Sequence, residues 1–180
     1  HVYAVPYAQL VQALYYRKGL FRAAGLAPTR PPADWDAFFE TARRLTDPTK
    51  GQWGFVLSQA DVSWYWINFL YSAGGDVTRR MPDGRTRAAF ATPEGETALE
   101  FFRKLLLTRW RHASGKEVTG VATRSTTLRQ EISDGKIGMW FAYQSDDLTN
   151  MNQYDLNPSL VGIAAMPRSP GGRSANELNA

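Results

Sequence analysis

The sequence predicts an α/β fold in which helices flank a mixed or parallel sheet. Short runs of β-branched and aromatic residues alternate along the chain with segments whose apolar residues recur at the helical spacing. Several of those segments begin at a capping residue and end at a glycine. The chain has 180 residues, of which 43% are hydrophobic and 21% charged, so it is long enough for one compact domain with its own core.

The first part of the chain predicts two strands and a short helix. Residues 2–7 (VYAVPY) predict a strand that stops at Pro6, because proline cannot donate a hydrogen bond to a neighbouring strand. Residues 13–16 (ALYY) predict a second strand. Residues 18–25 (KGLFRAAG) predict a short helix that Gly25 terminates.

The next helix has the clearest start and stop. Asp34 is a good N-cap, and residues 47–51 (DPTKG) end the helical pattern. The apolar residues between these two signals have the helical period, and they are Trp35, Phe38, Phe39, Ala42 and Leu45. The sequence therefore predicts an amphipathic helix here.

A strand and an apolar helix follow. Residues 52–58 (QWGFVLS) have the composition of a strand. Residues 63–75 carry apolar side chains on nearly every face of a helix, and Gly74 and Gly75 end it. A helix of this kind is expected to be mostly buried.

A hairpin and a long helix occupy the middle of the chain. Asp83 and Gly84 predict a turn within residues 81–93. The helix begins at Pro93 and is predicted to continue through Trp110, with two glutamates near its positive end. Its predicted core face consists of Ala98, Leu99, Phe102, Leu105 and Leu106.

Predicted helices and strands also alternate in the last third of the chain, and we find no internal repeat in the sequence. Residues 125–135 predict a helix, and residues 136–143 (KIGMWFAY) predict a buried strand. Residues 145–154 predict a capped helix, residues 160–167 a further strand, and residues 168–174 a loop.

The composition excludes several kinds of site. The chain has no cysteine, which excludes disulfides, thiolate metal sites and cysteine nucleophiles. Its two histidines are too few for a histidine-ligated metal site, and it contains no known nucleophile or nucleotide-binding motif. No stretch approaches the roughly 20 apolar residues of a membrane span. We therefore predict no enzymatic activity and no cofactor.

Two other functional classes are weaker alternatives. Asp146 with Asp147, or Glu94 with Glu96, could imitate the carboxylate pair of a carbohydrate-active enzyme, but such close neighbours on a helix do not face each other. A nucleic-acid-binding α/β domain would use the arginines for phosphate contacts. Those arginines are scattered over several predicted elements with acidic residues between them, which is typical of a solvated surface.

The order of segments resembles the family 1 extracellular solute-binding proteins of ABC importers, a maltose-binding-protein-like family. No single segment is diagnostic, but the ordered set is specific and covers essentially the whole chain. The matching segments are VYAVPY, ALYYRKGLFRAAGL, PPADWDAFFETARRLTD, WGFVL, INFLYSAGGDV, FATPEGETALEFFRKLL, RQEISDGKIGMWFA and VGIAAMPRSPGG.

This resemblance implies a type II periplasmic-binding-protein-like fold of two lobes, with residues 1–180 as the second, C-terminal lobe between two hinge crossings. Residues 2–6 and 176–179 are then expected to lie side by side. The implied function is capture of a small polar solute, most readily a sugar, in the cleft between the lobes and delivery to an ABC permease.

The resemblance also implies partners and a location. The expected partners are the solute, the first lobe of the same protein and the permease subunits, with no nucleic acid. Membrane contact is expected only through the transporter or through a lipid anchor outside these residues. The implied location is extracytoplasmic, in the periplasm or at the cell surface.

The candidate binding residues are those that the resemblance places at the cleft. Trp64 falls where sugar-binding members carry a cleft aromatic, and Trp66 is the second choice; burial in the core is the alternative for both. Many members carry a tryptophan just past the strand of residues 136–143, and here only Tyr143 can replace it. For Ser145 and Asp146 the alternative to solute binding is capping of a helix. For Asp76 the alternative is a structural role in a turn. The full set is Trp64, Trp66, Tyr143, Gln144, Ser145, Asp146, Tyr7, Gln9 and Asp76.

One turn departs from the family pattern. Arg17 and Gly19 stand where asparagine and aspartate are usual. In the family these residues cap the following helix, so the departure is expected to affect local stability more than function.

Overall fold

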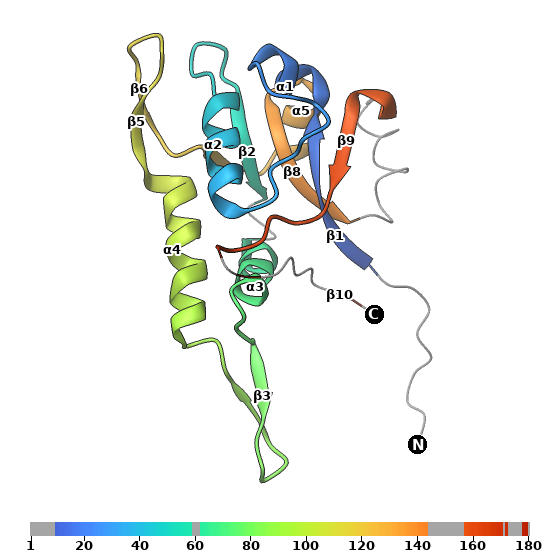
Figure 1. Cartoon of the computed structure of the whole chain (residues 1–180), viewed down its shortest axis with the longest axis vertical. Helices are drawn as coiled ribbons and strands as arrows, with labels where there is room; N and C mark the ends of the chain where they lie inside the picture. The colour runs from blue at the N-terminus through green and yellow to red at the C-terminus, as the bar shows by residue number, and fades with distance from the viewer. Residues whose placement is uncertain (1–9, 59–61, 144–156, 171, 173–177, 180) are drawn as a thin grey trace.

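The computed structural model describes residues 10–58, 62–143, 157–170, 172 and 178–179. It contains a mixed sheet with helices on both faces and two small hairpins (Figure 1). The strand order is β10-β1-β8-β2-β7, and β9 also pairs with β1. The strands are β1 (Leu10–Arg17), β2 (Trp53–Ser58), β7 (Ala122–Ser125), β8 (Ile137–Tyr143), β9 (Val161–Ala164) and β10 (Leu178–Asn179).

The sheet is mixed because β1 runs against its neighbours. Strand β1 is antiparallel to β8, β9 and β10, whereas β2 is parallel to β7 and β8. Side chains alternate between the two faces of each strand. Tyr16 of β1, for example, lies in the larger core, and Tyr15 lies in the smaller core on the other face. The predicted fold class is confirmed.

The larger core lies beneath four helices and is rich in aromatic side chains. Trp35 stacks on Phe101 with ring centroids 4.5 Å apart, and Phe38 meets Phe55 edge to face at 5.0 Å. These contacts join two helices to the sheet. The helices are α1 (Lys18–Ala23), α2 (Trp35–Leu45), α3 (Val62–Ser72) and α4 (Pro93–Leu107).

Helix α5 (Leu128–Ser133) contributes to the smaller core on the other face of the sheet. Its Ile132 is fully buried there with Tyr15 and Trp140. The Arg17 guanidinium donates hydrogen bonds to the carbonyls of Ile132 and Ser133, at the C-terminal end of α5. At this departure from the family pattern α1 begins without a side-chain cap, and the expected effect on local stability stays a prediction. Arg17 occupies the N-cap position without a side-chain capping bond, and Gly19 lies within the helix.

The predicted helix starts are confirmed where a side chain caps them. Asp34 Oδ1 accepts a hydrogen bond of 2.8 Å from the backbone N–H of Ala37, which satisfies one free donor at the start of α2. Thr92 caps α4 in the same way through the N–H of Gly95. Gly25 has φ +68°, the left-handed conformation predicted for the residue that stops α1.

Helix α4 differs from its prediction in length and in orientation. It ends at Leu107, and Trp110 belongs instead to a hairpin of β5 (Arg109–Arg111) and β6 (Glu117–Thr119). The assignment of Leu99 to the core is wrong, because this side chain is 59% exposed, while Phe101 is buried. The residue pattern of the sequence does not predict β5, β6 or β7.

A second hairpin extends away from the body of the molecule (Figure 1). It consists of β3 (Thr78–Arg80) and β4 (Thr86–Ala88), with the predicted turn at Asp83 and Gly84 between them. A short 3-10 helix, η1 (Pro158–Leu160), leads into β9. Across the described residues, no helix has the length and apolar character needed to cross a membrane.

The two ends of the described chain meet in the sheet. Leu10 and Val11 of β1 pair with Asn179 and Leu178 of β10. The expected neighbourhood of residues 2–6 and 176–179 is itself not tested, because residues 1–9 and 173–177 lie outside the described residues. The predicted strand at 2–7 and the predicted helix at 145–154 lie outside them as well.

Candidate functional site

Several elements converge at one end of the sheet. Parallel strands β2 and β8 finish there, at Ser58 and Tyr143, and the antiparallel strand β1 begins there, with Gln12 directly opposite Tyr143. Helix α3 starts shortly after β2 and lies below this end of the sheet in Figure 1. In open α/β sheets, ligands bind outside the carboxyl ends of parallel strands. We call this end of the molecule the candidate cleft edge.

Trp64 is the large aromatic side chain exposed in the first turn of α3. Its side chain is 41% exposed, while the adjacent Tyr65 is 3% exposed and packs in the core. An exposed indole offers a flat apolar face with a hydrogen-bonding edge. Such a face suits the C–H surface of a sugar ring, so the geometry is compatible with the role predicted for Trp64.

A buried pair of amides anchors the start of α3 to the sheet. Asn68 donates a hydrogen bond to the side-chain oxygen of Gln12 and another, of 3.1 Å, to the carbonyl of Trp64. Gln12 and Asn68 are each 1% exposed, where an unmade hydrogen bond would be costly. The pair therefore fixes the backbone that carries Trp64 relative to β1.

These two amides are not among the candidate residues predicted from the sequence. A signal was present, because Gln12 interrupts an apolar strand and Asn68 interrupts an apolar helix. A polar residue isolated in a buried element needs a hydrogen-bond partner. The sequence alone could not identify the two residues as partners of each other.

Trp66 lies on a different side of α3 from Trp64. Two residues along a helix differ by about 200° around its axis. Trp66 is half-buried and meets Phe90 edge to face, with ring centroids 5.8 Å apart. It lines a groove of about 670 Å³ at the start of α4, together with Phe90, Pro93 and Leu99. The structure thus does not bring the two candidate tryptophans together.

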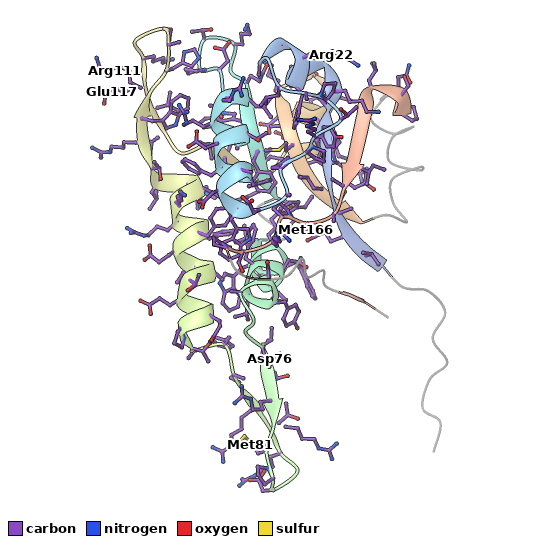
Figure 2. All side chains as sticks on the ribbon, viewed as in Figure 1. Arg22, Asp76, Met81, Arg111, Glu117 and Met166 are labelled. Atoms are coloured by element: carbon purple, nitrogen blue, oxygen red, sulfur yellow. The ribbon has the colours of Figure 1, made fainter. Side chains whose placement is uncertain are left out.

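The remaining candidate residues stay predictions. Asp76 is exposed and lies in the segment between α3 and β3, at the base of the β3–β4 hairpin (Figure 2). Tyr143 is placed only by its backbone, opposite Gln12. The other candidates lie outside the described residues, and they are Tyr7, Gln9, Gln144, Ser145 and Asp146.

The described acidic residues do not form a recognisable catalytic or metal site. Among the described residues, no three histidine, aspartate or glutamate side chains cluster as a metal site. A hydrogen bond from the Thr92 hydroxyl lowers the pKa of Glu94, and the nearby charge of Arg79 lowers it further. A general acid at neutral pH needs a raised pKa, whereas the pKa of Glu94 is lowered by its contacts at the start of α4.

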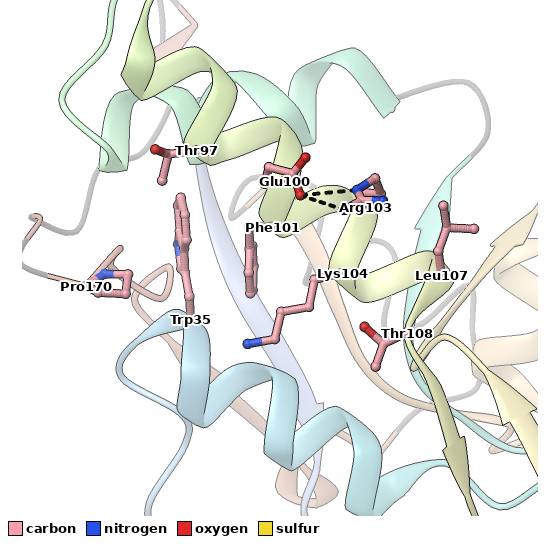
Figure 3. A pocket seen from close by; sticks show the side chains of 9 residues that line it. All are labelled: Trp35, Thr97, Glu100, Phe101, Arg103, Lys104, Leu107, Thr108 and Pro170. Carbon is pink, nitrogen blue, oxygen red and sulfur yellow. Dashed lines mark hydrogen bonds and ion pairs between the residues drawn. The ribbon is translucent and has the colours of Figure 1, made fainter.

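A separate groove of about 520 Å³ lies between α2 and α4 (Figure 3). Trp35 and Phe101 stack within it, and Lys104 reaches across to Asp36 with an N–O distance of 3.1 Å. Glu100 and Arg103 form an ion pair at its rim. This groove is formed by the helical layer and contains none of the candidate residues from the sequence.

The chain is similar to a family of known function. A family model described as bacterial extracellular solute-binding protein matches residues 2–177. A binding protein of Brucella abortus (strain 2308) is 26% identical over 175 residues, which cover 94% of this chain and 39% of that protein. A mannitol-binding protein of Pseudomonas aeruginosa is 34% identical over 105 residues, which cover 56% of this chain and 23% of that protein.

The fold is similar to that of solved binding proteins. The cyclic alpha-maltosyl-1,6-maltose binding protein of Arthrobacter globiformis superposes with a TM-score of 0.74 at 27% identity. The superposition covers 97% of this chain and 41% of that protein. The Brucella and Arthrobacter proteins match nearly the whole of this chain. The chain spans only about two fifths of the length of each of them.

Proposed function

The chain belongs to the bacterial extracellular solute-binding protein family, and we propose that it forms one lobe of a protein that captures a sugar or sugar alcohol and delivers it to an ABC permease. The family match over residues 2–177 carries this proposal. Residues 1–180 would be the second lobe, and a first lobe would face the candidate cleft edge. The family is extracellular, so the protein works outside the cytoplasm.

Two relatives support the solute class. One is a mannitol-binding protein, and one structural neighbour binds a cyclic maltosyl-maltose. Both solutes are neutral and polyhydroxylated. The exposed Trp64 face would cover the C–H surface of such a solute, and polar groups of both lobes would bind its hydroxyls. Candidate groups on this lobe are Tyr143 and the three residues after it.

The proposed mechanism is binding and release without chemistry. The hinged lobes would close over the solute, and the permease would recognise the closed form. The Gln12–Asn68 pair would keep the Trp64 backbone in place during closure, because it ties α3 to the sheet inside this lobe. The family binds substrates and does not transform them, and we extend that to this chain: it modifies no sugar.

Calorimetric titration of the two-lobed protein tests the proposal. Mannitol and maltose are titrated. Sodium chloride and glycine are the controls, because neither carries the several hydroxyl groups of a sugar or sugar alcohol. We expect saturable binding of at least one of the two solutes and none of the controls. After prolonged incubation, chromatography should return the bound solute unchanged. The proposal would be contradicted if no sugar or sugar alcohol in a wider panel bound to the protein. It would also be contradicted if the protein converted a sugar and a single carboxylate substitution abolished that conversion.

A further inference from the structure

The β3–β4 hairpin has a high net positive charge for its length. Residues 78–88, which we call the arginine hairpin, contain four arginines and one aspartate. That gives a formal charge of +3, against +4 for the whole chain. Every residue of β3 and β4 is exposed, and the hairpin extends beyond the body of the molecule, with Met81 in the part farthest from it (Figure 2).

The aspartate of this hairpin pairs with only one of its four arginines. Arg79 lies directly opposite Arg87 in the antiparallel register, an arrangement in which like charges destabilise a strand pair. Arg85 is paired with Asp83 at 2.8 Å. Among the described residues, neither Arg80 nor Arg87 forms an ion pair. Arg79 also interacts electrostatically with Glu94, so Arg80 and Arg87 are the two arginines whose charges an external anion would offset.

The arginines also project from both faces of the ribbon. Successive residues of a strand point to opposite faces, so Arg79 and Arg87 share one face while Arg80 lies on the other with Thr86. A flat acidic patch on another protein would contact only one face of the ribbon. A layer of anionic groups that the projecting end enters would contact both.

From this geometry we propose that the arginine hairpin binds anionic phospholipid headgroups at the membrane surface. Guanidinium groups bind phosphate oxygens with two parallel hydrogen bonds. The hairpin offers little to insert into hydrocarbon, because Met81 is its only long apolar side chain and is half-buried. The contact is thus electrostatic and confined to the headgroup layer. It goes beyond the expectation that the membrane is met only through the transporter or a lipid anchor.

The contact is weak and reversible. Each basic residue near an anionic surface contributes about 1 kcal/mol of attraction, and this contribution fades within a Debye length of about 10 Å at 0.1 M salt. A net charge of +3 therefore holds the protein at the surface briefly. Such an encounter would concentrate the protein near a membrane partner without immobilising it.

Sedimentation with vesicles tests the proposal on the chain itself. The chain is mixed at low salt with vesicles of pure phosphatidylcholine or of equal parts phosphatidylcholine and phosphatidylglycerol. The test variant is Arg80→Gln/Arg87→Gln. The control variant is Arg109→Gln/Arg124→Gln, which removes the same charge from two exposed arginines outside the hairpin. Circular dichroism verifies that both variants are folded.

We expect the wild-type chain to bind the anionic vesicles and to dissociate when salt is raised. The hairpin variant should lower the partition coefficient about thirtyfold, which corresponds to about 2 kcal/mol at 1.4 kcal/mol per tenfold. The control variant should change it by less than about threefold. Three results would overturn the proposal: no binding by the wild type, equal binding by the hairpin variant, or equal losses in the two variants. Because no solute is present, the outcome is independent of the proposed transport function.

Discussion

The side-chain amide of Asn68 in α3 donates a hydrogen bond to the side-chain oxygen of Gln12 in β1, and both residues are 1% exposed. The same Asn68 side chain donates to the carbonyl of Trp64, one turn earlier in the helix. A single buried amide therefore connects the backbone of the candidate binding residue to strand β1 of the sheet. The pair thus ties the first turns of α3, which carry Trp64, to β1.

Breaking this pair on one side should destabilise the fold. Asn68→Leu keeps the approximate volume of the side chain but leaves the Gln12 oxygen buried without this donor. The expected loss is about 1 to 3 kcal/mol in the free energy of unfolding, measured by urea denaturation. In the double variant Gln12→Leu/Asn68→Leu both polar groups are removed, and a substantial part of the loss should be recovered. A double variant whose losses simply add would contradict a direct coupling between the two residues.

Two glycines of this fold should respond to alanine in opposite directions. A Cβ at Gly54 would lie 1.9 Å from the carbonyl oxygen of Ala42, a backbone atom of the helix packed on β2. Gly54→Ala must therefore push α2 away from the sheet, and we expect it to destabilise the protein by about 2 kcal/mol or more. At Gly19, within α1, a Cβ would meet nothing within 4 Å.

Gly19→Ala is the matched control because the substitution is the same. It should stabilise the protein by about 0.5 to 1 kcal/mol, since alanine loses less backbone freedom in a helix than glycine does. Thermal melting of the two variants measures both effects. Equal melting temperatures for the two would show that the contact between Gly54 and Ala42 does not limit the packing of α2.

Asp47 should make the stability depend on acid pH. Hydrogen bonds from the Lys50 ammonium and the Thr49 hydroxyl, in that order, lower the pKa of this carboxyl below its usual range. Because the folded pKa lies below the unfolded value of about 3.9, the stabilisation is present above that value and is lost as the pH falls towards the folded pKa. Asp47→Asn should therefore lower the melting temperature at pH 7 and change it less as the pH approaches 2.

Carboxyl titration by NMR gives a second measurement of the same contact. Lys50→Met removes the group that lowers the Asp47 pKa most, so the pKa should rise towards its usual value. A carboxyl that titrates identically in the wild type and in Lys50→Met would rule out the 2.6 Å contact between Lys50 Nζ and Asp47 Oδ2 as the cause.

Local signals predicted most of the fold, because each predicted element is determined by short-range physics. Asp34 caps α2 as expected, and Gly25 adopts the left-handed conformation that ends α1. The missed strand β7 has only four residues, and it pairs with β2, which is far away in the sequence. A strand this short contains too few residues for an alternation of apolar and polar side chains to be recognised in the sequence.

The error on α4 has a related cause. The helical period shows that an apolar stripe exists, but the rotation of the helix about its axis depends on what it packs against. Here Trp35 stacks on Phe101 and draws that side chain into the core, which turns Leu99 outward. The candidate site was predicted only through family resemblance. Composition and spacing could not reveal that Trp64 is exposed while Tyr65 is buried.

The role of Trp64 can be separated from packing by comparing it with Trp35. Trp64 is 41% exposed, whereas Trp35 is 3% exposed and stacked on Phe101. Trp35→Ala opens a cavity in the core and should cost about 3 to 5 kcal/mol of stability. Trp64→Ala opens no enclosed cavity, so its cost should be below about 1 kcal/mol. Urea denaturation of the two variants measures this difference in the chain itself.

In the two-lobed protein, we expect sugar affinity to depend on Trp64 and not on Trp35, the reverse of the expected effects on stability. Losing a stacking platform removes contacts that the bound solute makes and the free protein does not, so Trp64→Ala should weaken sugar binding at least about tenfold, or about 1.4 kcal/mol. Trp64→Phe should retain part of the affinity because it keeps a flat ring. Trp35→Ala should leave the affinity per folded molecule unchanged, since its ring lies under α4 and not at the candidate cleft edge. If Trp64→Ala binds sugar as tightly as the wild type, Trp64 is not the platform, and Tyr143 becomes the residue to test.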